Sequence, residues 1–312
     1  MAMGKVWQRL EVGDVVDVVA PASACKPHEL AAGVRYLKSL GLVPHVPKDI
    51  LRPQSLNFSN SDERRLLHLK DALLNSKSKA IWCLRGGYGA LKLIPDLEKL
   101  KRPSHCKVLL GFSDITTLHG FLNQKWGWPT LHSPVLTRMG GANARASEKR
   151  ELQQMLFGRR AVTEFTGLLP LNSSARTQKT VRGKVRGGNI AVLQSSYGTR
   201  QQFDGRGHMI FLEDIGEKPH RVDRMLEQMT QAGTFQHAKA ILFGQFDLEN
   251  RKDLNLIWND VIPRFAKQQK IPVLKGLRVG HGKNQHTLPL NTLATLSLGP
   301  RGSKLSVEVG FR

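Results

Sequence analysis

Two patterns of apolar residues alternate along the first half of the chain. Short apolar runs predict strands, and the stretches between them repeat apolar residues at helical spacing. The predicted strands cover 15–20, 43–46, 80–83 and 108–112, and the predicted helices cover 28–40, 61–74, 90–100 and 116–124. Buried strands separated by helices are typical of a parallel sheet with helices on both faces. In such a sheet, the loops at the carboxyl ends of the strands form the ligand site.

The second half has a more mixed pattern. Strands are predicted at 209–212, 240–244, 273–276, 293–298 and 306–309, and helices at 188–196, 221–231 and 254–267. The stretch between the halves has few apolar periodicities, so we interpret 161–182 as a linker between a domain at 1–160 and a domain at 183–312. The pattern therefore predicts an α/β protein with a parallel-sheet first domain and a mixed, β-rich second domain.

A serine follows the predicted strand at 108–112. Gly111 and Phe112 precede Ser113, and a predicted helix follows it. A serine in such a turn is a candidate nucleophile elbow, because the turn exposes the hydroxyl and the helix points its first N–H groups at a developing anion. The alternative is that Ser113 or Asp114 only caps the helix, since both side chains accept hydrogen bonds from free N–H groups.

A serine nucleophile needs a base, and the base needs an acid that orients it. Among the eleven histidines, His281 stands out because the glycines on both sides let the backbone bring its ring close to a partner. Glu213 directly follows an apolar run, where an acid either belongs to a site or begins a surface turn, and Asp214 and Glu217 are alternatives to it. We interpret His119, on the helix after Ser113, as a packing or surface residue.

The chain is strongly basic. Lysine and arginine number 47 against 25 aspartates and glutamates, which gives a net charge of +22. Such a charge attracts anionic partners, including nucleic acid, an anionic wall polymer and acidic small substrates. The sequence has no nucleic-acid-binding motif and no zinc-ligand spacing, so we interpret the charge as a generally basic surface and expect no nucleic-acid partner.

Three cysteines without a C-x-x-C pair indicate a reducing compartment rather than a disulfide framework. The N-terminus imitates a signal peptide, but Asp14 and Asp17 interrupt its apolar stretch and Pro21 ends it. No apolar run is long enough to span a membrane. We therefore expect a cytoplasmic protein.

The order of the motifs resembles that of the LD-carboxypeptidases of murein recycling and their microcin-immunity relatives, which are serine peptidases with a Ser-Glu-His triad. The matching motifs extend over nearly the whole chain and lie at 13–14, 18–21, 85–90, 111–116, 118–119, 187–189, 212–214, 217, 280–282 and 288–290. Asn291 departs from the pattern, because glycine usually follows this last motif in the family.

The resemblance implies a Rossmann-like N-terminal domain with Ser113 as nucleophile and a C-terminal domain with Glu213 as acid and His281 as base. It also implies a homodimer. We expect the main-chain N–H groups of Gly87 and Asp114 to hold the oxyanion. Arg85 could bind the free carboxylate of the substrate or equally make a structural hydrogen bond. No metal or cofactor is expected.

The reaction that the resemblance implies is hydrolysis of the L,D peptide bond that releases terminal D-alanine from murein tetrapeptide, in cell-wall recycling. An immunity-type peptidase that cleaves a peptide–nucleotide antibiotic would use the same machinery, and its phosphate-bearing substrate would suit the basic charge. A third possibility from a different class is a basic protein that binds nucleic acid or wall polymer on a hydrolase-like fold.

Overall fold

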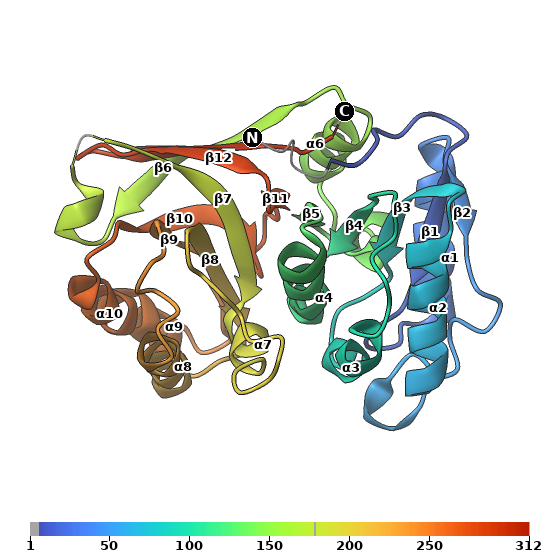
Figure 1. Cartoon of the computed structure of the whole chain (residues 1–312), viewed down its shortest axis with the longest axis horizontal. Helices are drawn as coiled ribbons and strands as arrows, with labels where there is room; N and C mark the ends of the chain where they lie inside the picture. The colour runs from blue at the N-terminus through green and yellow to red at the C-terminus, as the bar shows by residue number, and fades with distance from the viewer. Residues whose placement is uncertain (1–5, 178, 312) are drawn as a thin grey trace. The chain divides into compact units, whose positions relative to one another are not determined.

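The computed structural model describes residues 6–177 and 179–311, and Figure 1 labels their helices and strands. The chain forms two compact units that part between Ala161 and Val162. The first unit contains the described residues of 1–161, 286–289 and 309–312, and the second contains those of 162–285 and 290–308. None of the helices in the described part of the chain is both long and apolar enough to cross a membrane.

A six-stranded sheet forms the centre of the first unit. Its order is β11-β5-β4-β3-β1-β2, and the pairs from β5 to β2 are parallel. The strands are β1 (Val15–Val19), β2 (Val43–His45), β3 (Ser78–Cys83), β4 (Val108–Gly111), β5 (Thr130–His132) and β11 (Leu288–Leu290). This confirms the parallel, Rossmann-like sheet that the sequence predicts for the first domain.

Side chains of successive strand residues point to opposite faces of this sheet, and both faces are buried. Leu110 belongs to a core with α1 (Pro27–Ser39), α5 (Leu136–Gly140) and α6 (Ala146–Leu156). Its neighbour Leu109 belongs to a second core, which contains α2 (Asp62–Leu74), α3 (Ile94–Leu97) and α4 (Thr116–Phe121). This two-sided burial explains why the strands read as continuous apolar runs.

Short helical turns complete the first unit: η1 (Ser55–Asn57), η2 (Ala90–Leu93), η3 (Ser113–Ile115) and the π-helix η4 (Leu122–Trp126). The beginning of α2 follows the sequence rule for helix caps. The Ser61 hydroxyl accepts a hydrogen bond from the Arg64 N–H, and Asp62 and Glu63 occupy the first turn.

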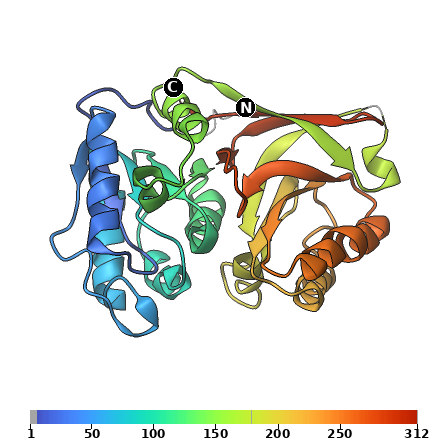
Figure 2. The same cartoon turned by 180° about the vertical axis from the view of Figure 1, so that it is seen from behind.

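A closed barrel forms the second unit, in the order β10-β6-β13-β12-β7-β8-β9. Its strands are β6 (Val162–Pro170), β7 (Thr180–Asn189), β8 (His208–Ile215), β9 (Ala240–Asp247), β10 (Val273–Gly280), β12 (Leu293–Ser297) and β13 (Ser303–Glu308). The run from β7 to β10 is parallel, and the other neighbours are antiparallel. Figure 2 shows β13 (red) beside β6 (lime). The predicted mixed, β-rich second domain is confirmed.

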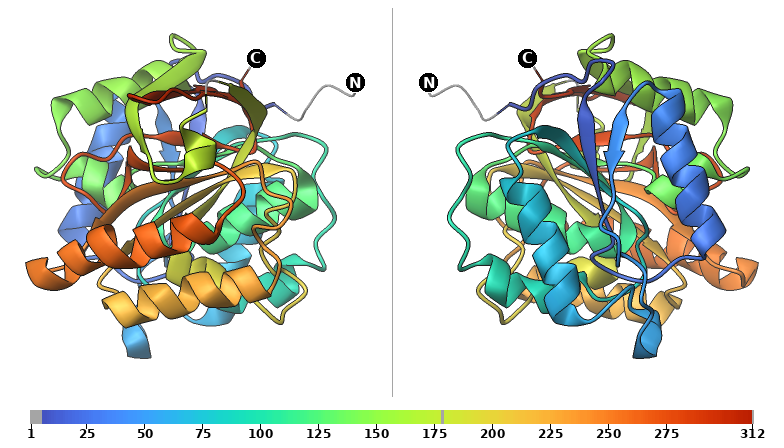
Figure 3. Two further views of the ribbon diagram at one scale, coloured as in Figure 1. Left: turned by 90° about the vertical axis from the view of Figure 1, so that its left-hand side faces the viewer. Right: turned by 90° about the vertical axis from the view of Figure 1, so that its right-hand side faces the viewer.

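Helices pack on the parallel part of the barrel: α7 (Ile190–Gln194), α8 (Pro219–Gln231), α9 (Arg251–Leu256), η6 (Ile257–Val261) and α10 (Ile262–Gln268), with η5 (Ser173–Ala175) after β6. Figure 3 shows α8 and α10 side by side along the strands. The side of α8 that faces the core carries Val222, Met225, Leu226 and Met229, at the spacing of one helical face.

The expected linker at 161–182 is corrected by the structure, because this segment contains β6, η5 and the beginning of β7. In β6 the buried residues are Thr163, Phe165 and Leu168. One of these three is polar, and Gly167, with φ of 72°, interrupts the alternation of faces. A strand with so few apolar residues gives a weak pattern. The expected second domain also loses residues 286–289 and 309–312 to the first unit.

Asn291, where the sequence departs from the family pattern, has φ of 61°. This left-handed conformation favours glycine, and asparagine is among the few other residues that adopt it readily. The Asn291 side-chain oxygen also accepts a hydrogen bond from Arg186 Nε at 3.0 Å. The substitution therefore keeps the turn and adds a contact to β7.

Candidate active site

Ser113 is the first residue of η3 and stands two residues beyond the carboxyl end of β4. Its φ is 64°, a left-handed conformation that costs a residue with a Cβ free energy. A strained serine between a buried strand and a helix is the geometry of a nucleophile elbow. The N-cap residue of η3 is Phe112, so Ser113 does not occupy the cap position of this helix.

The glycine-rich loop after β3 packs directly against this serine. A Cβ at Gly86 would lie 2.9 Å from the Ser113 Cβ and 3.2 Å from its Oγ, so a larger residue would displace the hydroxyl. The next residue, Gly87, has φ of 102°, and a Cβ there would collide with Ser23. The Ser23 hydroxyl accepts a hydrogen bond from the Tyr88 N–H at 3.1 Å. Ser23 therefore holds the loop, although the sequence analysis did not single it out.

Asp114 follows the serine and is 4% exposed. Its Oδ2 accepts a hydrogen bond from the Ala90 N–H at 2.8 Å, which links η3 to the end of the glycine-rich loop. Burial raises the pKa of Asp114 to about 6, against the opposing effect of this hydrogen bond. Arg85, at the beginning of the loop, is exposed, and its Nη1 lies 4.0 Å from Glu29 Oε2.

His119 is fully buried beneath the same turn, as the packing interpretation expected. Its Nε2–H donates a hydrogen bond to the Gly111 carbonyl at 2.9 Å. Burial lowers the pKa of His119 to about 3, and the nearby His132 contributes in the same direction. A neutral imidazole therefore supports the strand end from which the Ser113 turn begins.

Glu213 and His281, which lie far apart in the sequence, form a hydrogen-bonded pair in the second unit. Glu213 lies near the end of β8 and is fully buried, and His281 directly follows β10. The His281 Nδ1–H donates to Glu213 Oε2 at 2.6 Å, and the His281 main-chain N–H donates to the same oxygen at 3.1 Å. This arrangement fixes the tautomer of the ring and leaves Nε2 able to accept a proton.

The glycines beside His281 make this approach possible. Gly280 has φ of 112°, and a Cβ there would lie 2.7 Å from both the Cβ and Oε2 of Glu213. A Cβ at Gly282 would collide with the side chain of Gln245. The two glycines therefore bring the backbone against the acid on one side and against β9 on the other.

The carboxylates around His281 control its charge. Burial acts to lower the pKa of His281, but the charge and hydrogen bond of Glu213, with smaller effects from Asp214 and Asp247, raise it above its ordinary value. A base in this setting gains a proton readily and is stabilised once it carries one.

The two alternative acids have other partners. Asp214 accepts hydrogen bonds from the Asn189 side chain at 3.1 Å and from the Ala191 N–H at 2.9 Å. Burial and the neighbouring Glu213 raise the pKa of Asp214 to about 7. Glu217 forms an ion pair with Arg221, with 2.6 Å between Oε2 and Nε. Of the three candidates, Glu213 is the one hydrogen-bonded to His281.

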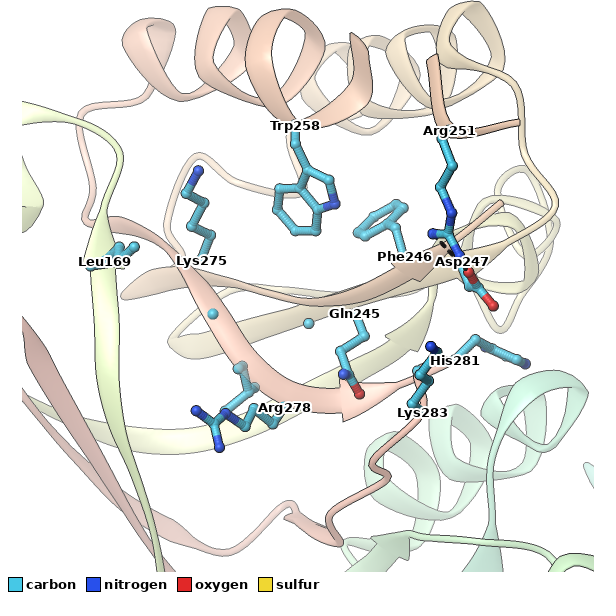
Figure 4. Close-up of a pocket in the computed structure, with 14 residues that line it drawn as sticks. Leu169, Gln245, Phe246, Asp247, Arg251, Trp258, Lys275, Arg278, His281 and Lys283 are labelled. Carbon is cyan, nitrogen blue, oxygen red and sulfur yellow. Dashed lines mark ion pairs between the residues drawn. The ribbon is translucent and has the colours of Figure 1, made fainter. Parts of the chain in front are cut away.

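A cavity of about 730 Å³ lies within the second unit, and His281 is one of its lining residues. Figure 4 shows that the labelled side chains come from β6, β9, β10, the loop after β10, and the helices α9 and η6. We name it the β9–β10 cavity. Three residues of its lining were not predicted from the sequence as site residues, although each stands within or beside a predicted element: Trp258, Lys275 and Arg278. In the described part of the chain, no group of three or more His, Cys, Asp or Glu side chains could hold a metal ion.

Comparison with known proteins identifies the family of the chain. Residues 16–133 match the model of the LD-carboxypeptidase N-terminal domain, and residues 182–296 match that of the C-terminal domain. A putative carboxypeptidase of Rickettsia conorii is 37% identical over 89% of this chain and 86% of its own length. The chain belongs to the LD-carboxypeptidase family. LD-carboxypeptidases are serine peptidases, so the protein is a hydrolase.

Other relatives and solved structures match over nearly their whole length. The murein tetrapeptide carboxypeptidase of Pseudomonas aeruginosa is 30% identical over 94% of this chain and 95% of its own. The solved muramoyltetrapeptide carboxypeptidase of Oxalobacter formigenes is 26% identical, with a TM-score of 0.79 over 94% of this chain and 98% of its own. An MccF-like protein of Bacillus anthracis has a TM-score of 0.82 at 20% identity, over 98% of this chain and 99% of its own, a likeness of fold alone.

Proposed function

We propose that this LD-carboxypeptidase family member hydrolyses the L,D peptide bond of murein tetrapeptide and releases the terminal D-alanine. Ser113 would be the nucleophile, His281 the general base and Glu213 the acid that orients the base. The observation that carries the proposal is the 2.6 Å hydrogen bond between His281 Nδ1 and the buried Glu213. A buried carboxylate that fixes a histidine tautomer is the orienting half of a serine hydrolase triad.

In the proposed reaction, Ser113 Oγ attacks the carbonyl carbon of the last peptide bond while His281 Nε2 takes its proton. The C–N bond then breaks, and His281 returns the proton to the leaving amine of D-alanine. Water, activated by the same base, cleaves the acyl-enzyme and releases the shortened peptide. Glu213 stabilises the imidazolium in both steps. The main-chain N–H groups of Gly87 and Asp114 are the proposed oxyanion donors, and Arg85 is a proposed partner of the terminal carboxylate.

We prefer the murein substrate over a peptide–nucleotide because the relatives named after murein peptides are more similar to this chain than the microcin-immunity protein is. Relatives at 30% identity are named murein tetrapeptide carboxypeptidase and probable murein peptide carboxypeptidase. The microcin C7 self-immunity protein MccF is 18% identical, which supports a common fold alone. The role in wall recycling, the homodimer and the cytoplasmic location stay predictions.

Replacing Ser113 with alanine tests the assignment. We expect Ser113→Ala to reduce the release of D-alanine from murein tetrapeptide on the order of 10⁴-fold or more, because the reaction loses its nucleophile. Mass spectrometry of the products measures this release, and circular dichroism checks that the variant is folded. Ser104→Ala, an exposed serine of the same unit, is the matched control. Near-parental activity in Ser113→Ala would refute the proposed nucleophile.

A further inference from the structure

The β9–β10 cavity is larger than the departing D-alanine needs. Its volume of about 730 Å³ falls within the ~300–1,000 Å³ range of sites that bind small-molecule ligands. His281 and Lys283 stand at one end of the lining, and Lys275 and Leu169 stand at the other in Figure 4. A ligand in the cavity would therefore touch the base and also extend well away from it.

The lining carries an excess of positive charge. Its cations are Arg251, Lys275, Arg278 and Lys283, and Asp247 is the single acid among the described lining residues. Asp247 already lies 3.7 Å from Arg251 in an ion pair. No ion pair joins Lys275 or Arg278 to a carboxylate in the part of the chain that the structure describes. These two cations can therefore attract an anion from solution.

Strand β10 carries both cations. Lys275 and Arg278 are three residues apart on β10, so regular alternation would place them on opposite faces. The pairing of β10 with β9 shifts register between Lys275 and Gly280, and Gly276 within this stretch has φ of 99°. Figure 4 shows the side chains of Lys275 and Arg278 on opposite sides of the β10 ribbon, and both residues line the cavity, so positive charge meets the cavity from both sides of the strand.

Aromatic rings also line the cavity. Trp258 packs edge-to-face on Phe246, with 5.5 Å between the ring centroids, and the Lys275 Nζ lies 5.9 Å from the Trp258 centroid. An anion held by Lys275 would therefore have its attached atoms against the indole ring. This combination selects a negatively charged group on a flat or apolar body.

We propose that the β9–β10 cavity binds the part of the substrate that is remote from the cleaved bond, with Lys275 and Arg278 attracting its anionic groups and Trp258 against the atoms attached to the group at Lys275. The proposal rests on the proposed function in one respect, namely that the bound molecule is also the one cleaved. A murein tetrapeptide offers carboxylates besides that of its terminal alanine, and a peptide–nucleotide offers a phosphate. The chemistry they share is an anion on an extended body.

The test compares two double variants that remove the same amount of charge. Lys275→Gln/Arg278→Gln changes the cavity, and Lys252→Gln/Lys267→Gln changes exposed lysines of the same unit outside the lining. For murein tetrapeptide, we expect the cavity variant to raise KM about tenfold and to leave kcat within about twofold, because it loses charge-assisted hydrogen bonds to a part of the substrate that does not react. The control should keep both constants. A KM that rises equally in both variants, or in neither, would overturn the proposal.

Binding measurements separate this proposal from the proposed function. Isothermal titration calorimetry on the Ser113→Ala protein, with and without the cavity substitutions, would use three probes: murein tetrapeptide, adenosine monophosphate and adenosine. Tighter binding of adenosine monophosphate than of tetrapeptide, lost with the cavity substitutions and absent for adenosine, assigns the cavity to phosphate. The reverse order assigns it to carboxylate.

The outcomes stay distinguishable if the parent enzyme does not cleave tetrapeptide. In that case the proposed function fails, but probe binding that depends on Lys275 and Arg278 still supports an anion-binding cavity. Failure of both anionic probes to bind, or binding that the cavity substitutions leave unchanged, overturns the cavity proposal whatever the activity shows.

Discussion

The turn at Ser113 and the pair formed by Glu213 and His281 are positioned by different physical means. Ser113 is held by backbone geometry, with φ of 64° and a glycine, Gly86, packed against its side chain. His281 is held by a buried charge, since its ring and its main-chain N–H both donate to one oxygen of Glu213. The comparison teaches that steric fit places the candidate nucleophile, whereas electrostatics places and tunes the candidate base.

The two means have different consequences for pH. Burial of Asp114 beside the serine raises the pKa of that carboxyl to about 6, but its main contact is to the Ala90 N–H of the loop. The carboxylates beside His281 raise the pKa of the group that is proposed to take the proton. The pH dependence of activity should therefore report on the second unit more than on the first.

Replacing Glu213 with glutamine has the largest expected effect on this comparison. Glu213→Gln should reduce kcat/KM roughly 10³- to 10⁴-fold, because the neutral amide neither fixes the tautomer nor stabilises the imidazolium. The base must be neutral to act, so activity rises with pH through the pKa of His281. Removing the carboxylate lowers that pKa, and the acidic limb of the residual kcat/KM profile should move to lower pH.

Glu217→Gln is the matched control, because Glu217 is an alternative acid whose partner is Arg221. It should leave both the rate and the acidic limb near their parental values. A large loss in Glu217→Gln together with a small one in Glu213→Gln would transfer the role of the acid to Glu217. An acidic limb that stays in place in Glu213→Gln would show that charge does not tune the base.

The sequence located Glu213 but could not separate it from Asp214. Adjacent strand residues point to opposite faces, and the face that meets His281 depends on how β8, β9 and β10 pair. That pairing joins residues far apart in the chain and includes register shifts, which no local pattern encodes. The Ser113 turn was easier to predict because strand, turn and helix are consecutive in the sequence.

Burial of polar side chains was the hardest feature to predict. The sequence analysis reads Thr163 as part of a linker, yet it is 1% exposed in β6. The cavity lining shows the same limit, because β10 continues through Lys275 and Arg278 to Gly280, beyond the predicted strand at 273–276. Apolar periodicity finds elements whose buried residues are apolar and misses those that bury polar ones.

Substituting Gly280 tests whether the base also depends on backbone geometry. Gly280→Ala should lower kcat/KM about 10²-fold, because the new Cβ collides with the Glu213 side chain and displaces the acid or the histidine. Activity would report the displacement of the acid or the histidine, and the melting temperature measured by circular dichroism would report any loss of stability. Gly207→Ala is the control, since Gly207 has φ of 74° and no heavy atom within 4 Å of a Cβ built there. Equal loss of activity in both variants would attribute the effect to strain rather than to contact with Glu213.

The smallest expected effect tests whether the Ser113 turn stores strain. Glycine adopts positive φ without the penalty that a Cβ brings, but it also gives the unfolded chain more freedom. Ser76 is an exposed serine outside the positive-φ region, so Ser76→Gly shows the second effect alone. We therefore expect the free energy of unfolding of Ser113→Gly to exceed that of Ser76→Gly by about 1 kcal/mol in urea titrations. Equal free energies of unfolding in the two variants would mean that the turn holds no strain. The contrast between a sterically placed nucleophile and an electrostatically placed base would then rest on Gly86 alone.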